Sequence, residues 1–225
     1  MTYTPITPGT INWDVPVNAA LTSQDSRITA NEAVDVTQNS RLTTIENKIS
    51  FRANPTDFGY ASWNYDSSMA GGGSQPAAGV LQMTSLFLPQ ATLITNVVLG
   101  VTIVGVTLTA GQNFAGLYDS TGALVDTSAD QSTNWTSLGP KVMPLTTTHS
   151  LPAGTYWVAM ATTGTTRPSF HRAGSFAGLG SIVNQGLTAT TYRFATSGSG
   201  VTTLPASVTM SGRSVSDTTW WVAAS

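Results

Sequence analysis

The chain contains no cysteine and few charged residues. Without cysteine it can form no disulfide, no thiolate metal site and no thiol nucleophile. Charged residues make up 9% of the 225 residues, against about 25% in an ordinary soluble domain. The formal net charge of -2 provides neither the basic footprint of a nucleic-acid-binding protein nor a polybasic membrane patch. We therefore expect a surface of hydroxyls and amides, suited to packing against further copies of the chain or against neutral partners such as sugars.

Long hydrophobic segments are missing too. The most apolar run, VVLGVTIVGVTL at residues 97–108, is too short to span a bilayer and is interrupted by Thr and Gly. The first residues, MTYTPITPGTINW, have neither a basic n-region nor an apolar h-region. We expect no membrane insertion and no signal peptide.

Three segments differ in composition. Residues 1–20 hold Pro5, Pro8, Gly9 and Pro16, which predict an extended arm rather than a continuous helix. Residues 21–50 contain neither Gly nor Pro and predict a helix. Residues 51–225 are rich in Gly, Thr and Ser with short β-prone runs, and no Glu follows Glu46. We expect an arm, a helical stalk and a β-rich head, in that order.

The helical segment carries a seven-residue repeat. With Leu42 at heptad position a, the a series is Leu21, Ile28, Asp35, Leu42 and Ile49, and the d series is Gln24, Asn31, Gln38 and Ile45. Arg27 and Arg41 then occupy g, and Glu32 and Glu46 occupy e of the next heptad. Neighbouring strands of a coiled coil pair their g and e side chains in this way. The repeat therefore predicts a coiled coil over residues 21–50.

The words SRITANE (26–32) and SRLTTIE (40–46) indicate how many strands to expect. RLTTIE resembles the Arg-hydrophobic-x-x-hydrophobic-Glu signature of three-stranded coiled coils, and RITANE matches it except at Asn31. The resemblance implies a parallel homotrimer. Asp35 departs from it, because three carboxylates would face each other on the axis unless Val34 or Val36 turns inward. Another oligomer, or a single helix packed against its own domain, remains an alternative, although the latter requires a wider apolar stripe.

The remaining sequence predicts strands without intervening helices. The runs are YASWNYD at 60–66, VLQMTSLFL at 80–88, TNVVLGVTIVGV at 95–106, NFAGLYDS at 113–120, GALVDTS at 122–128, GTYWVAMAT at 154–162, TATTYRFAT at 188–196 and DTTWWVAAS at 217–225. LYDSTGALV is a hairpin signal, with Asp119 and Gly122 bounding a tight turn. The pattern favours a mainly β fold, an antiparallel β-sandwich or jelly roll.

The arm supplies a second resemblance. TPGTINWDVPVNAALTSQDSRI resembles the N-terminal segments of tail-fibre and minor tail proteins of tailed bacteriophages, in which a short arm leads into a coiled coil. The segments LYDSTGALVDTSAD and LPAGTYWVAM resemble the C-terminal β-domains of such proteins in the character of their strands, without a shared motif. The resemblance implies a virion protein that is made in the host cytoplasm and docks on a phage tail or capsid protein through Pro8, Asn12, Trp13 and Asp14.

Two functions fit this organisation. In the first, a non-enzymatic trimeric appendage recognises a carbohydrate of the host surface, such as a cell-wall glycan, through its β-head. In the second, the chain is a capsid head fibre or decoration protein without a receptor of its own. A polysaccharide-degrading spike would need a carboxylate pair on the head surface.

The head shows no recognised catalytic spacing and no motif for a cofactor. Asp119, Asp126 and Asp130 are close enough in sequence to bind Ca²⁺, but carboxylates that cap turns are the preferred interpretation. GGGSQP at 71–76 lacks a following basic residue and predicts a flexible loop rather than a phosphate site. We expect no catalytic residue, no metal and no cofactor.

One segment concentrates charge and aromatic rings. TGTTRPSFHRAGSF at 163–176 places Arg167, Phe170, His171 and Arg172 in a loop-like stretch, and Trp135 lies in another. Planar donors beside an aromatic ring suit sugar hydroxyls or carboxylates. These five residues are the ligand-binding candidates, with trimer contacts or buried packing as the alternative. Adjacent Trp220 and Trp221 should point to opposite faces of a strand, so that one lies in the core and the other covers an interface or is exposed.

Overall fold

The computed structural model describes the backbone of residues 14–50 and 53–225 and the side chains of residues 18–42 and 53–225. It divides into two compact units, Met1–Ala53 and Asn54–Ser225. Each is described by itself. None of the helices in the described residues is both long enough and apolar enough to cross a membrane.

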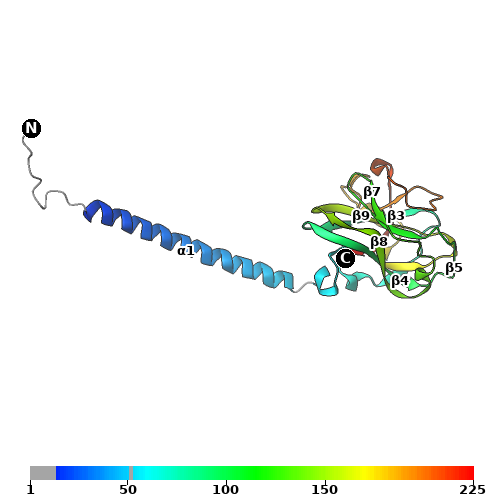
Figure 1. Ribbon diagram of the computed structural model, residues 1–225, viewed down its shortest axis with the longest axis horizontal. Helices are drawn as coiled ribbons and strands as arrows, with labels where there is room; N and C mark the ends of the chain where they lie inside the picture. Colours follow the sequence, from blue (N-terminus) through cyan, green and yellow to red (C-terminus); the bar gives the residue numbers. More distant parts are fainter. Residues whose placement is uncertain (1–13, 51–52) are drawn as a thin grey trace, which may run out of the picture. The chain divides into compact units, whose positions relative to one another are not determined.

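The first unit contains one unbroken helix, α1, Asp14–Ser50 (Figure 1). It begins before the predicted start at residue 21, so part of the segment predicted as an extended arm is helical. Pro16 is tolerated because it lies in the first turn, where backbone N–H groups have no partner within the helix. Along α1 the hydroxyls of Thr22, Ser26, Thr29 and Thr37 each donate to the carbonyl four residues earlier, at 2.9 Å.

The second unit is a β-sandwich-like head built from antiparallel strands (Figure 1). Its strands are β1 Ser62–Trp63, β2 Gly72–Ser74, β3 Leu81–Leu88, β4 Thr92–Ile103, β5 Thr107–Leu108, β6 Phe114–Tyr118, β7 Leu124–Thr127, β8 Gly139–Leu151, β9 Gly154–Ala161, β10 Gly164–Thr166, β11 Ser169–Ser175, β12 Phe194–Ser197, β13 Ser214–Val215, β14 Thr218–Trp220 and β15 Ala223–Ala224. A short helix, α2 Leu179–Val183, and 3-10 turns at Pro55–Phe58, Ser67–Met69, Asn134–Thr136 and Met210–Gly212 complete it.

Two large sheets make the layers. The seven-stranded sheet has the order β1-β15-β4-β11-β14, with β8 on β4 and β2 on β11, and the six-stranded sheet has the order β13-β12-β3-β9-β6-β7. The strand and hairpin predictions are confirmed for β3, β4, β6, β7 and β9. In the hairpin, Gly122 has φ +90° and its N–H donates to the carbonyl of Asp119 at 3.1 Å.

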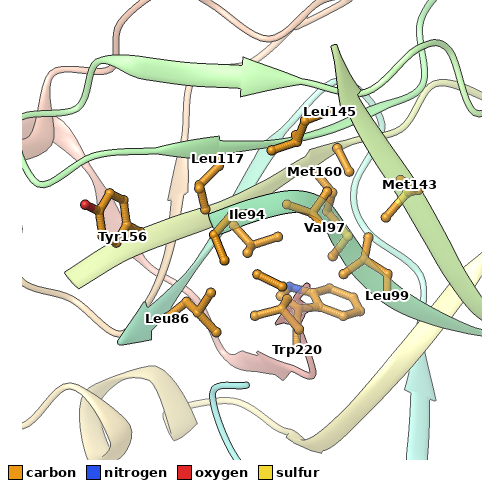
Figure 2. Packing of buried hydrophobic residues seen from close by; sticks show 14 of the residues in the cluster. Leu86, Ile94, Val97, Leu99, Leu117, Met143, Leu145, Tyr156, Met160 and Trp220 are labelled. Atoms are coloured by element: carbon orange, nitrogen blue, oxygen red, sulfur yellow. The ribbon is translucent and has the colours of Figure 1, made fainter. Parts of the chain in front are cut away.

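The main core lies between the two sheets (Figure 2). Leu86, Leu117 and Met160 face it from the six-stranded sheet, and Leu99 and Met143 face it from the seven-stranded sheet. Both layers must therefore be present before either can bury its apolar face.

Trp220 and Trp221 point to opposite faces, as predicted, but both are buried. Trp220 belongs to the main core, whereas Trp221 packs with Val98 on the other face of the seven-stranded sheet. Tyr60 and Trp63, from the segment that enters the head, cover Trp221. The sequence-based expectation of an exposed or interfacial second tryptophan is wrong, because a chain segment far away in sequence covers that face.

Two further predictions are corrected, and one strand was missed. The segment 163–176 is not a loop, because it contains β11, which pairs with β2, β4 and β14. GGGSQP is not a flexible loop, since Gly72–Ser74 forms β2. The long strand β8 was not predicted, because Pro140 and Pro144 and the hydroxyl-rich run that follows weaken its β signal.

Candidate functional site

The surface of α1 is the first candidate. Every described side chain of this helix, residues 18–42, is exposed, including Ile28 and Leu42 at 54% each. Within its own unit the helix has no second element that could bury an apolar stripe over residues 18–42. The apolar side chains of α1 are therefore available to another chain.

The predicted heptad positions lie together on this helix. Gln24, Arg27, Ile28 and Asn31 line one shallow depression, and Gln38, Asn39, Arg41 and Leu42 line another. Both sets combine a, d and g positions on one face. Among the described residues Arg27 and Glu32 form no ion pair within the chain, so both charges remain free for a neighbouring helix. The side chains of Ile45, Glu46 and Ile49 lie outside the described residues.

The predicted docking residues are not placed. Pro8, Asn12 and Trp13 lie outside the described residues. Asp14 is the first residue of α1, and its side chain is not described. Virion docking by these residues stays a prediction.

Two of the ligand-binding candidates belong to the core. Trp135 and Phe170 are each 0% exposed, and their rings meet edge to face with centroids 5.0 Å apart. Phe170 also meets Trp220 edge to face at 6.5 Å. Neither Trp135 nor Phe170 has surface to offer a ligand, so both are removed from the candidate site. Adjacent residues of a strand point to opposite faces, so Phe170 turns inward where His171 turns away from the core.

The three charged candidates fasten the segment 70–76 to the sheet. Arg167 donates to the carbonyls of Pro76 at 3.2 Å and Gly164 at 2.9 Å. His171 Nδ1 donates to the carbonyl of Ala70 at 2.9 Å, and Arg172 Nε donates to Gly73 at 3.1 Å. These contacts support the packing interpretation for Arg167 and His171. Arg172 uses only Nε in this bond, so its two terminal nitrogens are not part of it.

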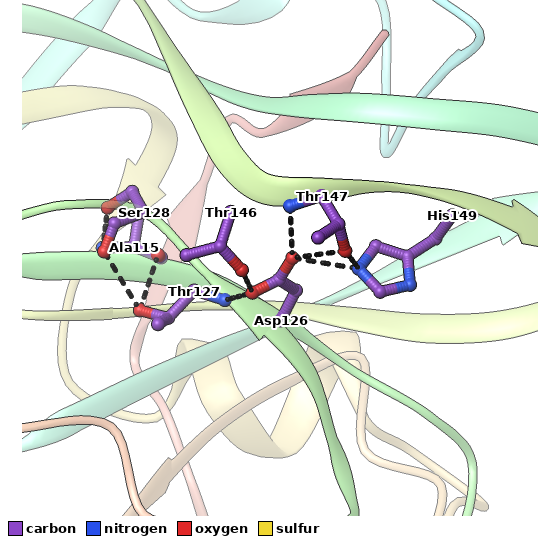
Figure 3. Close-up of polar contacts among 7 residues, drawn as sticks. All are labelled: Ala115, Asp126, Thr127, Ser128, Thr146, Thr147 and His149. Carbon is purple, nitrogen blue, oxygen red and sulfur yellow. Dashed lines mark hydrogen bonds and ion pairs between the residues drawn. The ribbon is translucent and has the colours of Figure 1, made fainter.

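A polar network at one edge of the sandwich was not predicted as a unit (Figure 3). Asp126 on β7 accepts hydrogen bonds from the hydroxyl of Thr146, from Thr147 N at 2.9 Å and from His149 Nε2 at 2.8 Å, all on β8. Thr127 N adds a bond at 2.8 Å. Because β7 belongs to one sheet and β8 to the other, this carboxylate ties the two layers together.

Burial by itself would raise the pKa of Asp126, which is 9% exposed. The hydrogen bonds from Thr146, His149, Thr147 and Thr127 outweigh burial and hold the pKa far below its ordinary value. Asp126 is therefore a permanently charged acceptor at neutral pH. Its charge is stabilised by hydrogen-bond donors from Thr146, Thr147 and His149.

The same network does not form a proton relay. His149 contacts both Asp126 and the hydroxyl of Thr147, at 2.8 and 2.9 Å, through the same nitrogen, Nε2. A nucleophilic triad requires the acid on one ring nitrogen and the hydroxyl on the other. The arrangement therefore fits a structural clamp.

The other two aspartates, Asp119 and Asp130, cap turns, as the preferred interpretation of the sequence has it. Asp119 Oδ1 accepts from Thr121 N at 2.8 Å and Ala123 N at 3.1 Å. Asp130 accepts from Asn113 N at 3.0 Å and from the hydroxyl of Ser132. Burial opposes these bonds in both residues, yet the pKa of each carboxyl is lowered. In the described part of the chain no three acidic or histidine side chains gather around a common point that could hold a metal.

A hollow of about 320 Å³ on the head involves residues that sequence reasoning did not single out. It is lined by Tyr65, Leu179, Arg193, Phe194 and Thr219, together with part of β11. These residues come from separate segments of the chain and form no local motif. Only the arrangement of the two sheets brings them together.

Comparison with known proteins found no matching family model, no similar curated protein and no similar solved structure. The function proposed below is therefore inferred from the residues of this chain.

Proposed function

We propose that the chain is one subunit of a non-enzymatic, homotrimeric bacteriophage virion appendage of the tail-fibre or minor-tail type. The arm attaches it to the particle, α1 forms a three-stranded stalk, and the β-head recognises a glycan on the host surface. The observation that carries this proposal is a helix that has a seven-residue repeat and no buried side chain over residues 18–42.

The stability of α1 depends on a packing partner. An isolated helix is marginal in water even when its propensity is good, and most helices in proteins depend on packing of an apolar face. α1 has 37 residues, a length of about 55 Å at ~1.5 Å per residue, and finds no such packing within the described residues of its own unit. Parallel copies in register would supply it, with Ile28 and Leu42 in the apolar layers and Arg27 reaching Glu32 of the next chain.

The composition of the head supports a recognition role rather than catalysis. Its strands are held by backbone pairing and by closed networks such as the one around Asp126. A rigid, weakly charged β surface suits contacts with neutral or singly charged sugars, which are read by a few placed polar groups. The assignment to a phage particle rests on the resemblance of the arm and on the two trimer-like words in α1.

The test is the solution mass of the full chain by light scattering. We expect three times the 23.4 kDa of one chain. The double variant Ile28→Asp, Leu42→Asp should be monomeric, because each substitution puts three carboxylates into an apolar layer. Val36→Asp is the matched control at an outward b position and should stay trimeric. A monomeric wild-type chain would refute the stalk. A trimer that tolerates the double variant but not Val36→Asp would mean that Val36 faces the axis.

The recognition half of the proposal has its own experiment. Fluorescently labelled full chain should bind host cell walls saturably and be displaced by wall-derived sugars. Binding to empty capsids instead, lost on removal of residues 1–13, would replace the receptor role with that of a head fibre or decoration protein.

A further inference from the structure

The hollow on the head lies where the two sheets meet α2. Gly174 on β11 and Thr219 on β14 contribute from the seven-stranded sheet, and Phe194 at the start of β12 contributes from the six-stranded sheet. Leu179, the first residue of α2, lies beside them. Its volume of about 320 Å³ is at the small end of the range of ligand sites, about 300–1,000 Å³, and suits one sugar residue.

A β-bulge shapes one wall. The register of β11 on β14 shifts between Arg172 and Ser175, next to Gly174. The hydroxyl of Thr219 donates to the Gly174 carbonyl at 3.1 Å and accepts from Gly174 N at 2.8 Å, which fixes the bulge. Bulges bend a strand and re-aim its side chains, and they occur often beside functional sites.

A buried amide holds the opposite wall. Asn184 is 4% exposed, and its Nδ2 donates to the carbonyls of Gly180 at 2.9 Å and Phe194 at 3.0 Å. Its Oδ1 accepts from Arg193 N at 2.7 Å. The backbone that presents Arg193 and Phe194 is therefore fixed before any ligand arrives.

The rim of the hollow carries positive charge without a carboxylate partner. Arg193 is exposed, and its guanidinium lies over the Phe194 ring, 5.7 Å from the centroid. Arg172 is near enough to the Tyr65 hydroxyl to act on it electrostatically. Within residues 53–225 the ion pair found is that of Asp126 and His149, so neither arginine is neutralised by an acid.

The other charged group on these elements is already engaged. Asp217, which precedes β14, accepts the N–H of Gly180 through Oδ1 at 2.8 Å. The Tyr65 hydroxyl donates to the carbonyl of Thr219 at 2.8 Å and keeps a lone pair for a donor. The hollow thus combines an apolar wall, a hydroxyl acceptor and an unpaired planar cation.

We propose that this hollow binds a carboxylated sugar residue, such as a hexuronic acid, with its carboxylate on the Arg193 fork and one ring face against the apolar side chains of Leu179 and Val183. The planar guanidinium matches a carboxylate with two parallel hydrogen bonds. A sugar hydroxyl donates to the Tyr65 oxygen. The binding chemistry holds whether or not the chain trimerises, but the role of this sugar as a receptor rests on the proposed function.

The experiment uses the full chain and saturation-transfer NMR with three probes: methyl glucuronide, methyl glucoside and glucose 6-phosphate. Methyl glucuronide should bind saturably at millimolar concentration, and the neutral glucoside at least about 10-fold more weakly, because it lacks the charge-assisted hydrogen bonds. Equal binding of the two, or tighter binding of the phosphate, would overturn the carboxylate assignment.

Variants locate the site. Arg193→Gln should weaken methyl glucuronide binding about 10-fold, whereas Arg193→Lys, which keeps the charge but loses the fork, should lie between it and the wild type. Ala173→Trp, at an exposed position lining the hollow, should abolish binding by filling it. Thr148→Trp, at an exposed position on β8, is the control and should bind normally. Undiminished binding by Ala173→Trp would overturn the proposal.

The solution mass of each variant is measured alongside. Loss of sugar binding by a protein of unchanged mass concerns the hollow alone. A monomeric wild-type chain that still binds methyl glucuronide would refute the trimeric appendage and leave the hollow standing.

Discussion

The two units of this chain solve the burial problem in opposite ways. The head satisfies itself, because its two sheets bury Phe170, Trp135 and Trp220 against each other. α1 buries no described side chain and leaves Ile28 and Leu42 more than half exposed. The comparison teaches that a head substitution should act on folding alone, while a substitution in α1 should act on assembly alone.

The largest effect on the free energy of unfolding should come from the aromatic centre of the head. Phe170→Ala removes a ring that contacts Trp135 and Trp220 edge to face and should cost about 4 kcal/mol. Chemical denaturation followed by tryptophan fluorescence measures it. Ile28→Ala is the matched control, and a similar loss of head stability there would contradict the independence of the two units.

The second-largest loss of stability should come from the Asp126 network, which links the two sheets. Asp126→Ala leaves the donors on Thr147 and His149 without an acceptor and should destabilise the head by about 2–3 kcal/mol. Asp119→Ala, in an exposed turn, is the control and should cost less.

The same carboxylate makes a prediction about pH. The pKa of Asp126 is lower in the folded head than its unfolded value of about 3.9, so the folded state binds fewer protons. The contribution of the ionised Asp126 carboxylate to the free energy of unfolding is complete above pH ~4. It is lost as the pH falls toward the folded-state pKa. The melting temperature of the wild type should therefore fall more steeply below pH 4 than the melting temperature of Asp126→Asn. Parallel curves would contradict the clamp.

Two glycines offer a smaller and sharper test. Gly111 and Gly122 both have positive φ, at +75° and +90°. An added Cβ at 111 meets nothing within 4 Å, whereas at 122 it would lie 2.2 Å from the Val208 carbonyl oxygen. Gly111→Ala should cost about 1 kcal/mol from backbone strain alone, and Gly122→Ala more than that. Equal costs in thermal unfolding would show that the Val208 segment moves freely.

The smallest effect concerns the axis of the stalk. Asp35→Asn should stabilise the trimer by about 1 kcal/mol per chain, because it removes repulsion among three a-layer carboxylates. Asp25→Asn, at an e position whose g partner on the neighbouring chain is the uncharged Ala20, should change little. Thermal melting of α1 by circular dichroism measures both, and a destabilised Asp35→Asn trimer would indicate that Val34 or Val36 occupies the axis instead.

Much of the fold could be predicted from alternation and composition. The β-prone runs at 95–106 and 154–162 correctly identified strands β4 and β9, and the Asp119–Gly122 turn correctly identified a hairpin. The lack of Gly and Pro over 21–50 identified the helix, and only its start was misplaced. These features are local, and local sequence encodes them.

What failed depends on distant segments. β11 reads as a polar loop until β2, β4 and β14 pair with it. Trp221 reads as exposed until Tyr60 and Trp63 cover it. Of the five ligand candidates, Trp135 and Phe170 lie in the core, and the hollow beside Arg193 assembles from segments without any shared motif.

The aromatic cover on Trp221 also has a mechanical consequence. Residues 54–65 connect α1 to the head, so any tension carried along the helix enters the sandwich through them. Ala61 N donates to the Ala224 carbonyl at 2.8 Å, Asn64 Nδ2 donates to the Trp220 carbonyl at 2.7 Å, and Trp63 packs beside Tyr60. A pull that reaches this segment is therefore shared by backbone pairing, a side-chain amide hydrogen bond and tilted aromatic rings at the β1 end of the seven-stranded sheet.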